Sequence, residues 1–214
     1  MSVSAATETT AVSTPGNDGS PDVTINVAED GTIAMGGSCG TSSSTTVSSG
    51  ANTLTLTDTD DTSDLGEATY SDCTVTFTDD AGNAAAALAL TAFVIDTTAP
   101  TLTPVSIVTD NTDTTGGMNG DTITLSFTAG ETISTPTCTF SDADGNALAG
   151  SVTVDNPQDE DWTCAVAIAD DDADGVVTFS IAFSDEAGNA GTAVTAVRSE
   201  EHTSELQSPC NLVC

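Results

Sequence analysis

Basic residues are almost absent from this sequence. Its 214 residues include 33 Asp and Glu but a single Lys or Arg, Arg198, and a single His, His202. Three of the acids follow Arg198, so residues 1–197 carry 30 acidic groups and no basic side chain. Proteins bind nucleic acids and anionic membranes through Lys and Arg. The charge balance therefore excludes both as partners and favours surroundings rich in salt or divalent cations.

Long apolar runs are also missing. No stretch approaches the roughly 20 apolar residues of a membrane-spanning helix, so the sequence predicts no membrane insertion. The first residues, Met1–Thr7, lack the basic and apolar regions of a secretory signal peptide. We therefore expect this chain to be a fragment of a longer protein, with any export signal outside it.

The sequence does contain an internal repeat. Val23–Ile33 aligns without gaps on Ile123–Ile133, and Phe77–Ala84 aligns on Phe183–Ala190. In both copies apolar and polar residues alternate, as they do in strands with one buried face. Turn residues separate these runs at short spacing, which favours antiparallel β-structure. At about 100 residues for one β-sandwich, the length predicts two of them.

The alternation also predicts which side chains are buried. The expected core faces are formed by Cys73, Val75 and Phe77 in the first copy, and by Trp162, Cys164, Val166, Ile168, Val177, Phe179, Ile181 and Phe183 in the second. Residues 84–92 are rich in Ala and at first suggest a helix. We predict a strand there, because the aligned residues 190–197 have a strand-like pattern and follow the same turn.

Each copy contains the pattern Asp-x-Ala-Gly-Asn, at Asp79–Asn83 and at Asp185–Asn189, followed by a last strand. In the first copy a linker, Asp96–Pro100, then introduces the second. This arrangement resembles the bacterial immunoglobulin-like repeats of large surface adhesins, in which the pattern forms the turn between strands F and G. The resemblance implies an all-β fold of two tandem immunoglobulin-like antiparallel sandwiches, at 1–96 and 97–197.

The C-terminal residues do not continue the repeat. The run Arg198–Ser208 resembles the conceptual translation of a short sequencing adapter, and Pro209–Cys214 often accompanies it. We interpret 198–214 as an artefactual, unstructured tail; a genuine polar tail is the alternative. Because Phe93–Asp96 has no counterpart before this tail, we expect the last strand of the second sandwich to be truncated.

Each copy contains two cysteines, Cys39 and Cys73 in the first and Cys138 and Cys164 in the second. Of the three connectivities that four cysteines allow, only Cys39–Cys73 with Cys138–Cys164 respects the domain boundary. Under the resemblance, the first disulfide would join inward positions of strands C and F, and the second would join C to E. Disulfides indicate an extracellular or cell-surface location. Free buried thiols are the alternative, and no Cys-x-x-Cys spacing suggests zinc.

Four carboxylates are candidates for a calcium site where the two domains join: Asp96, Glu131, Asp185 and Glu186. In a sandwich the F–G turn lies at the end where the chain enters the domain. Asp185 and Glu186 are therefore expected near the linker residue Asp96, with Glu131 of the B–C turn close by. Oxygen ligands of this kind suit Ca²⁺, and similar adhesin repeats bind calcium at such junctions. A solvated acidic surface is the alternative.

Asp170–Gly175 matches the opening of an EF-hand calcium loop. The twelfth position of that loop requires a bidentate Glu, but this sequence has Ile181, which belongs to a predicted core face. We interpret this run as the turn between strands E and F.

The same absences bear on function. Without His or Lys before Arg198, a Ser or Cys nucleophile lacks its usual base, and glycosidase chemistry needs a cleft that slim sandwiches rarely offer. We therefore predict no enzymatic activity. The resemblance implies a structural spacer of a secreted or surface adhesin, whose partners are neighbouring immunoglobulin-like repeats and an unidentified protein or carbohydrate ligand. The alternative is a non-catalytic accessory or carbohydrate-binding module of a secreted enzyme.

Overall fold

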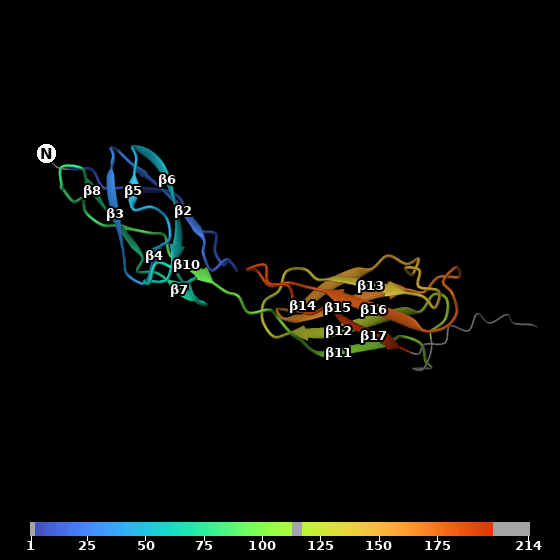
Figure 1. Cartoon of the computed structure of the whole chain (residues 1–214). Coiled ribbons are helices and arrows are strands. Elements are labelled where there is room, and N and C mark those ends of the chain that lie inside the picture. The colour runs from blue at the N-terminus through green and yellow to red at the C-terminus, as the bar shows by residue number, and fades with distance from the viewer. Residues whose placement is uncertain (1–2, 113–116, 199–214) are drawn as a thin grey trace, which may run out of the picture. The chain divides into compact units, whose positions relative to one another are not determined.

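The computed structural model describes residues 3–112 and 117–198 (Figure 1). In these residues all regular elements are β-strands. Across 84–92, where we predict a strand, there is no helix, and only Leu88–Ala89 form a strand. Accordingly, none of the described residues forms a helix long and apolar enough to cross a membrane. The prediction of an unstructured tail falls, apart from Arg198, outside the described residues.

The chain divides into two compact units. Unit 1 comprises Met1–Thr98 with Glu186–Asn189, and unit 2 comprises Ala99–Asp185 with the chain from Ala190 onward. The division after Thr98 is two residues later than the boundary predicted at residue 96. The short segment Glu186–Asn189 was expected to belong wholly to the second domain.

Unit 1 consists of two four-stranded antiparallel sheets and a two-stranded pair (Figure 1). The first sheet has the order β1 (Thr7–Thr10), β2 (Asp22–Val27), β6 (Gly50–Thr57), β4 (Gly40–Thr41). The second has the order β5 (Thr46–Val47), β3 (Gly31–Gly36), β8 (Thr74–Asp79), β9 (Leu88–Ala89). The separate pair is formed by β7 (Ala68–Tyr70) and β10 (Phe93–Ile95).

Unit 2 has a four-stranded and a three-stranded sheet. The first has the order β11 (Leu102–Thr109), β12 (Thr122–Ala129), β15 (Asp161–Ala167), β14 (Thr153–Gln158). The second has the order β13 (Thr137–Ser141), β16 (Val177–Ala182), β17 (Val194–Arg198). Lettered A to G in chain order, these sheets are A-B-E-D and C-F-G, the strand order of a constant-type immunoglobulin sandwich. The predicted all-β, immunoglobulin-like fold is confirmed.

The aligned segments of the repeat occupy the same strand in both units. Val23, Ile25 and Val27 of β2 are buried in the core of unit 1, and the side chains at the aligned positions of β12 are buried in unit 2: Ile123, Leu125 and Phe127. Every residue of the predicted core faces is buried as well. The buried residues of β2 and β12 alternate with polar ones, Thr24 and Asn26 in β2 and Thr124 and Ser126 in β12, because successive side chains of a strand lie on opposite sides of the sheet.

Unit 1 carries a further characteristic of this fold that the sequence analysis did not use. Tyr70 is the last residue of β7, three residues before Cys73, and its hydroxyl donates a hydrogen bond of 2.9 Å to the carbonyl oxygen of Gly66. A tyrosine that bonds backwards at the E–F corner is a feature of immunoglobulin sandwiches. The ring also stacks on Phe93 of β10, with centroids 5.2 Å apart.

Both predicted disulfides are present. Cys138 of β13 and Cys164 of β15 are bonded, which joins strands C and E, and therefore the two sheets of unit 2, as predicted. Cys39 and Cys73 are bonded too, but neither lies inside a strand. Cys39 follows β3 and Cys73 immediately precedes β8, so this disulfide joins the ends of neighbouring strands C and F of one sheet.

The end of unit 2 differs from the prediction. Strand β17 pairs with β16 over five residues, from Val194 opposite Ile181 to Arg198 opposite Val177. The last strand is therefore formed, and the backbone of Arg198, which we assigned to the unstructured tail, belongs to it. Strand G of unit 2 is one continuous strand paired with F, whereas in unit 1 the corresponding chain is divided into β9 and β10.

Removing either disulfide is expected to destabilise its own unit. The bonded residues are separated by 34 positions in unit 1 and by 26 in unit 2. In the chain-entropy description each closed loop contributes about 3.5 to 4 kcal/mol, and these two loops differ by only about 0.2 kcal/mol. The double variant Cys138→Ala/Cys164→Ala should therefore lose about 3.5 kcal/mol of unfolding free energy in urea.

Trp162 is the only tryptophan of the chain and lies in the core of unit 2, so its fluorescence follows this unit alone. The variant Cys39→Ala/Cys73→Ala serves as the control. It should leave the fluorescence transition in place while lowering the stability of unit 1, measured by circular dichroism. Equal loss in the fluorescence transition for both variants would contradict independent units.

Candidate functional site

Unit 2 brings two of the predicted calcium ligands together. Ile133 and Asp185 form an antiparallel bridge, and the Ser134 N–H donates to the Ser184 carbonyl oxygen at 2.8 Å. Glu131 lies two residues before this bridge, in the turn between β12 and β13. One carboxylate oxygen of Glu131 lies within 4.8 Å of one of Asp185. The pairing of the B–C turn with the end of strand F therefore creates the carboxylate pair.

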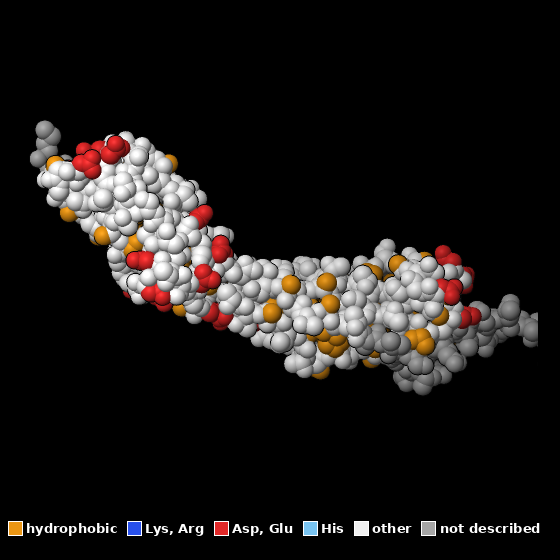
Figure 2. All heavy atoms as spheres, in the orientation of Figure 1, with side chains coloured by type: hydrophobic (Ala, Val, Ile, Leu, Met, Phe, Trp, Pro, Cys, Tyr) orange, Lys and Arg blue, Asp and Glu red, His pale blue; other side chains and the backbone are white. Residues whose placement is uncertain are grey.

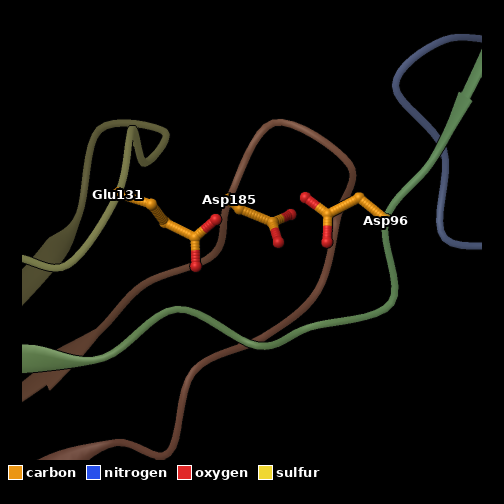
Figure 3. A group of neighbouring side chains, drawn as sticks. All are labelled: Asp96, Glu131 and Asp185. Carbon is orange, nitrogen blue, oxygen red and sulfur yellow. The ribbon is translucent and has the colours of Figure 1, made fainter. Parts of the chain in front are cut away.

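Asp96 is the third member of the group of neighbouring carboxylates drawn in Figure 3. It belongs to unit 1 and lies three residues before Ala99, where unit 2 begins. Three residues span at most about 10 Å. The start of unit 2 is in turn fixed beside Glu131, because the Gly130 N–H donates to the Thr101 carbonyl oxygen at 2.8 Å. A site that Asp96 shares with this pair stays a prediction.

The fourth predicted ligand is not part of this group. Glu186 is exposed, whereas the adjacent Asp185 is 3% exposed and Glu131 is half-buried. Asp185 pairs with Ile133, whereas Glu186 lies in the bend that follows, and only Asp185 is buried. The prediction placed both acids at the site because sequence alone does not fix which of them points inward.

Carboxylates at this separation repel each other, and the repulsion grows where burial removes water. A divalent cation offsets that repulsion, and carboxylate oxygens are the ligands that Ca²⁺ prefers. Calcium takes about six to eight oxygens, so backbone carbonyls and water would have to complete the coordination. Cation binding by this group stays a prediction, and the group offers no nucleophile with a base beside it.

Asp170–Gly175 forms the turn between β15 and β16, as predicted, and Ile181 is buried in the core. Asp172 is engaged in holding this turn. One of its oxygens accepts from the Ala169 N–H and the other from the Ala149 N–H, both at 2.8 Å. The carboxylate therefore acts as a local backbone acceptor that connects two loops.

The F–G turn pattern occurs three times, and the sequence analysis found two. The third copy, Phe140–Ala147, follows strand C of unit 2 and has the same spacing, Phe-x-Asp-x-x-Gly-Asn-Ala, as Phe77–Ala84 and Phe183–Ala190. All three are closed by the same backbone bridge, from the residue before the Asp to the final Ala. Their glycines have φ between 83° and 94°, a conformation that other residues rarely adopt.

Two of these turns are held by their own aspartate. The Asp79 carboxylate accepts from the N–H of Asn83 at 2.7 Å, and Asp142 accepts from that of Asn146 at 2.8 Å. Asp142 is buried, and burial by itself raises its pKa. Hydrogen bonds from Ala173, Asn146 and Asp144 outweigh that effect and lower the pKa below its ordinary value. In the turn at Phe183–Ala190, the Asn189 side chain donates to the Asp96 carbonyl oxygen at 2.7 Å.

The linker is fastened to unit 1 by a carboxylate that sequence analysis missed. Glu67 lies just before β7 and accepts hydrogen bonds from the hydroxyls of Thr98, at 2.6 Å, and Thr97, at 3.4 Å. The Thr98 hydroxyl contributes most to lowering the pKa of Glu67. Thr98 N–H also donates to the Asp96 carboxylate at 3.1 Å. No pattern in the sequence connects Glu67 to residues 30 positions away.

Comparisons with known proteins give no family. No family model and no curated protein matches this chain. Among solved structures, the titin Ig tandem domains A164-A165 align at 14% identity over 95% of this chain and 99% of theirs, with a TM-score of 0.29. The D00-D0 domain of intimin aligns at 14% identity over 91% of this chain and 98% of its own, with a TM-score of 0.32. The immunoglobulin-like fold of this chain is given by its own strand order.

The linker contact predicts an acid-sensitive hydrogen bond. Because the pKa of Glu67 is lowered in the folded chain, the bond is fully formed above the ordinary pKa of a glutamate. It is lost as pH falls through the lowered value. Thr98→Val should raise the pKa of Glu67 toward its ordinary value, followed by NMR of the carboxyl carbon.

Thr97→Val is the matched control, since it removes the longer of the two hydroxyl contacts. It should shift the Glu67 titration less than Thr98→Val does. An unchanged titration in Thr98→Val would show that this hydroxyl does not hold the carboxylate.

Proposed function

We propose that this chain is a structural spacer of a secreted or surface adhesin-like protein, placed between neighbouring immunoglobulin-like repeats. One observation carries the proposal. Each unit has its own hydrophobic core and its own internal disulfide, and the two follow each other directly in the chain. Such units stabilise themselves and can be repeated, as a spacer requires. What the spacer displays is a surface ligand, protein or carbohydrate, that these residues do not define.

The chemistry of the surface supports a location outside the cell. Disulfides persist in oxidising surroundings. Figure 2 shows acidic side chains on the visible surface of both units, and residues 1–197 contain no Lys or Arg. A chain with this charge repels its own copies and stays soluble where salt screens the repulsion. Because Arg198 is its one Lys or Arg, the chain also offers trypsin a single cleavage site, and an exposed spacer benefits from such resistance.

The alternative of a carbohydrate-binding accessory module depends on exposed aromatic rings. Trp162 is 8% exposed, and all six phenylalanines of the chain are buried: Phe77, Phe93, Phe127, Phe140, Phe179 and Phe183. Tyr70 is half-buried, and its ring stacks on Phe93. The described residues therefore offer no platform of exposed rings on which a sugar could stack, which favours the spacer.

Calcium is the second part of the proposal. Glu131 and Asp185 would supply the first oxygens, and Asp96 of the linker would supply another. A cation bound by both unit 2 and the linker restricts the linker's motion, since each ligand loses freedom when the ion binds. Calcium would then stiffen the linker, which Glu67 already holds to unit 1 through its hydrogen bond from Thr98.

Pulling on the chain tests the spacer. We expect single-molecule force spectroscopy to give two separate unfolding events, one for each unit. The disulfides hide the chain between their cysteines, which is 34 residues in unit 1 and 26 in unit 2. A reducing agent should therefore lengthen the two events by about 120 Å and about 90 Å. A single event, or extension at negligible force, would contradict two mechanically independent modules.

Thermal unfolding tests calcium. Millimolar Ca²⁺ should raise the melting temperature above that in EDTA, because a ligand that binds only the folded state stabilises it. Glu131→Gln and Asp185→Asn should reduce this shift. Glu186→Gln is the control, because it removes the same charge from an exposed acid outside the group.

General screening must be separated from binding. NaCl at equal ionic strength should stabilise all variants alike, since screening does not depend on one carboxylate. If Ca²⁺ raised the melting temperature equally in Glu131→Gln and Glu186→Gln, calcium would be acting by general screening and not at this site. The spacer proposal would survive that result, because it does not require a metal.

A further inference from the structure

The loop that joins β11 to β12 contains the only Asn-Gly pair in the sequence, Asn119–Gly120. Both residues are exposed and form the centre of a tight turn, in which the Asp121 N–H donates to the Met118 carbonyl oxygen at 2.9 Å. Gly120 has φ +91°, and no atom lies within 4 Å of the position that a Cβ would occupy. Nothing in the side-chain space of Gly120 therefore shields its backbone nitrogen.

An asparagine followed by glycine is chemically labile for a steric reason. The backbone nitrogen of the following residue can attack the asparagine side-chain carbonyl carbon, and a Cβ on that residue normally hinders the approach. Glycine has no Cβ. An exposed Asn-Gly turn thus combines an accessible electrophile with the least hindered backbone nucleophile.

We propose that Asn119 is a site of spontaneous covalent modification, deamidation through a succinimide, and that this reaction breaks the contact between the A–B and E–F loops of unit 2. The required co-reactant is water. The inference concerns unit 2 alone and does not depend on the spacer function or on calcium.

The reaction balances without an oxidant or a cofactor. The Gly120 amide nitrogen loses its proton to solvent and forms a bond to Cγ of Asn119. The Cγ–Nδ2 bond breaks, and the nitrogen leaves as ammonia. Water then opens the five-membered ring: attack at Cγ gives aspartate, and attack at the backbone carbonyl carbon gives isoaspartate, in which the chain runs through the side chain.

Two hydrogen bonds to the E–F loop restrain both reacting groups. The Gly120 N–H donates to the Ile168 carbonyl oxygen at 2.9 Å, and the Asn119 Nδ2 donates to the Asp170 carboxylate. The first bond holds the nucleophile, and the second holds the leaving nitrogen. The reaction therefore requires local opening of this contact, and loosening the contact should accelerate it.

The product cannot restore the contact. Deamidation replaces the Nδ2 donor by a second carboxylate opposite Asp170, and two like charges at hydrogen-bond distance repel. The other acid of the turn, Asp121, already accepts from the Met118 N–H and the Asn111 side chain, so it adds negative charge to the same loop. Conversion at Asn119 should thus separate the two loops irreversibly.

The site is tested by incubating the intact chain at neutral to alkaline pH and mapping it by peptic digestion and mass spectrometry. Amide-to-acid exchange and isoaspartate should accumulate first at Asn119, faster as pH rises and faster still in urea with the disulfides reduced. Conversion no faster at Asn119 than at the other asparagines, or a rate unchanged by unfolding, would overturn the proposal.

Two variant pairs test the contact. Asp170→Ala should accelerate conversion in the folded chain severalfold, whereas Asp171→Ala, which removes the same charge from the exposed neighbour, should not; equal rates would refute restraint by Asp170. Asn119→Asp should lower the melting temperature of unit 2 at neutral pH, and Asn119→Ser should do so less. No difference between these two variants would show that the product does not disturb the loops.

Discussion

Hydrogen bonds from neutral donors to carboxylates are the interaction on which this structure depends, because residues 1–197 contain 30 acids and no basic partner. Hydroxyl groups fill that role repeatedly. The Thr98 hydroxyl bonds Glu67, the Ser63 hydroxyl bonds Asp60, and the Thr128 hydroxyl bonds Asp161, each at 2.6 Å. Ser63 and the N–H groups around it lower the pKa of Asp60 to about 2. Bonds to an ionised acceptor are stronger than neutral ones.

These acceptors also connect loops that the strand ladders leave apart. Asp142 ties the turn after strand C to the E–F loop through the Ala173 N–H, and Asp172 ties the E–F loop to Ala149. Glu67 does the same for the linker. Asn119 is another neutral donor to an acid, since its side-chain amide bonds the Asp170 carboxylate. Its conversion to aspartate would leave two acids facing each other.

Much of the fold could be predicted because it depends on local periodicity. Alternation in Cys73–Phe77 and in Val177–Phe183 identified buried strand faces, and the Gly-Asn turns identified where strands reverse. Two cysteines in each copy identified the disulfides. The third turn, at Phe140–Ala147, had an equally clear signal but lies after strand C, so a search at domain spacing passed over it. A strand-like pattern was recognised in 190–197, but its continuation to Arg198 was missed because composition at Arg198 suggested a break.

The sequence by itself determined the fold class, the two-unit organisation and the charge of the surface, because each follows from residue type and short-range spacing. Only the tertiary structure decided which carboxylates meet. Glu131 and Asp185 come together because the Ile133 bridge joins the B–C turn to the end of strand F. Glu186 lies outside because the chain bends directly after the bridge at Asp185 and leaves this side chain exposed. Direction across a sheet depends on register, and register is set by partners far away in the chain.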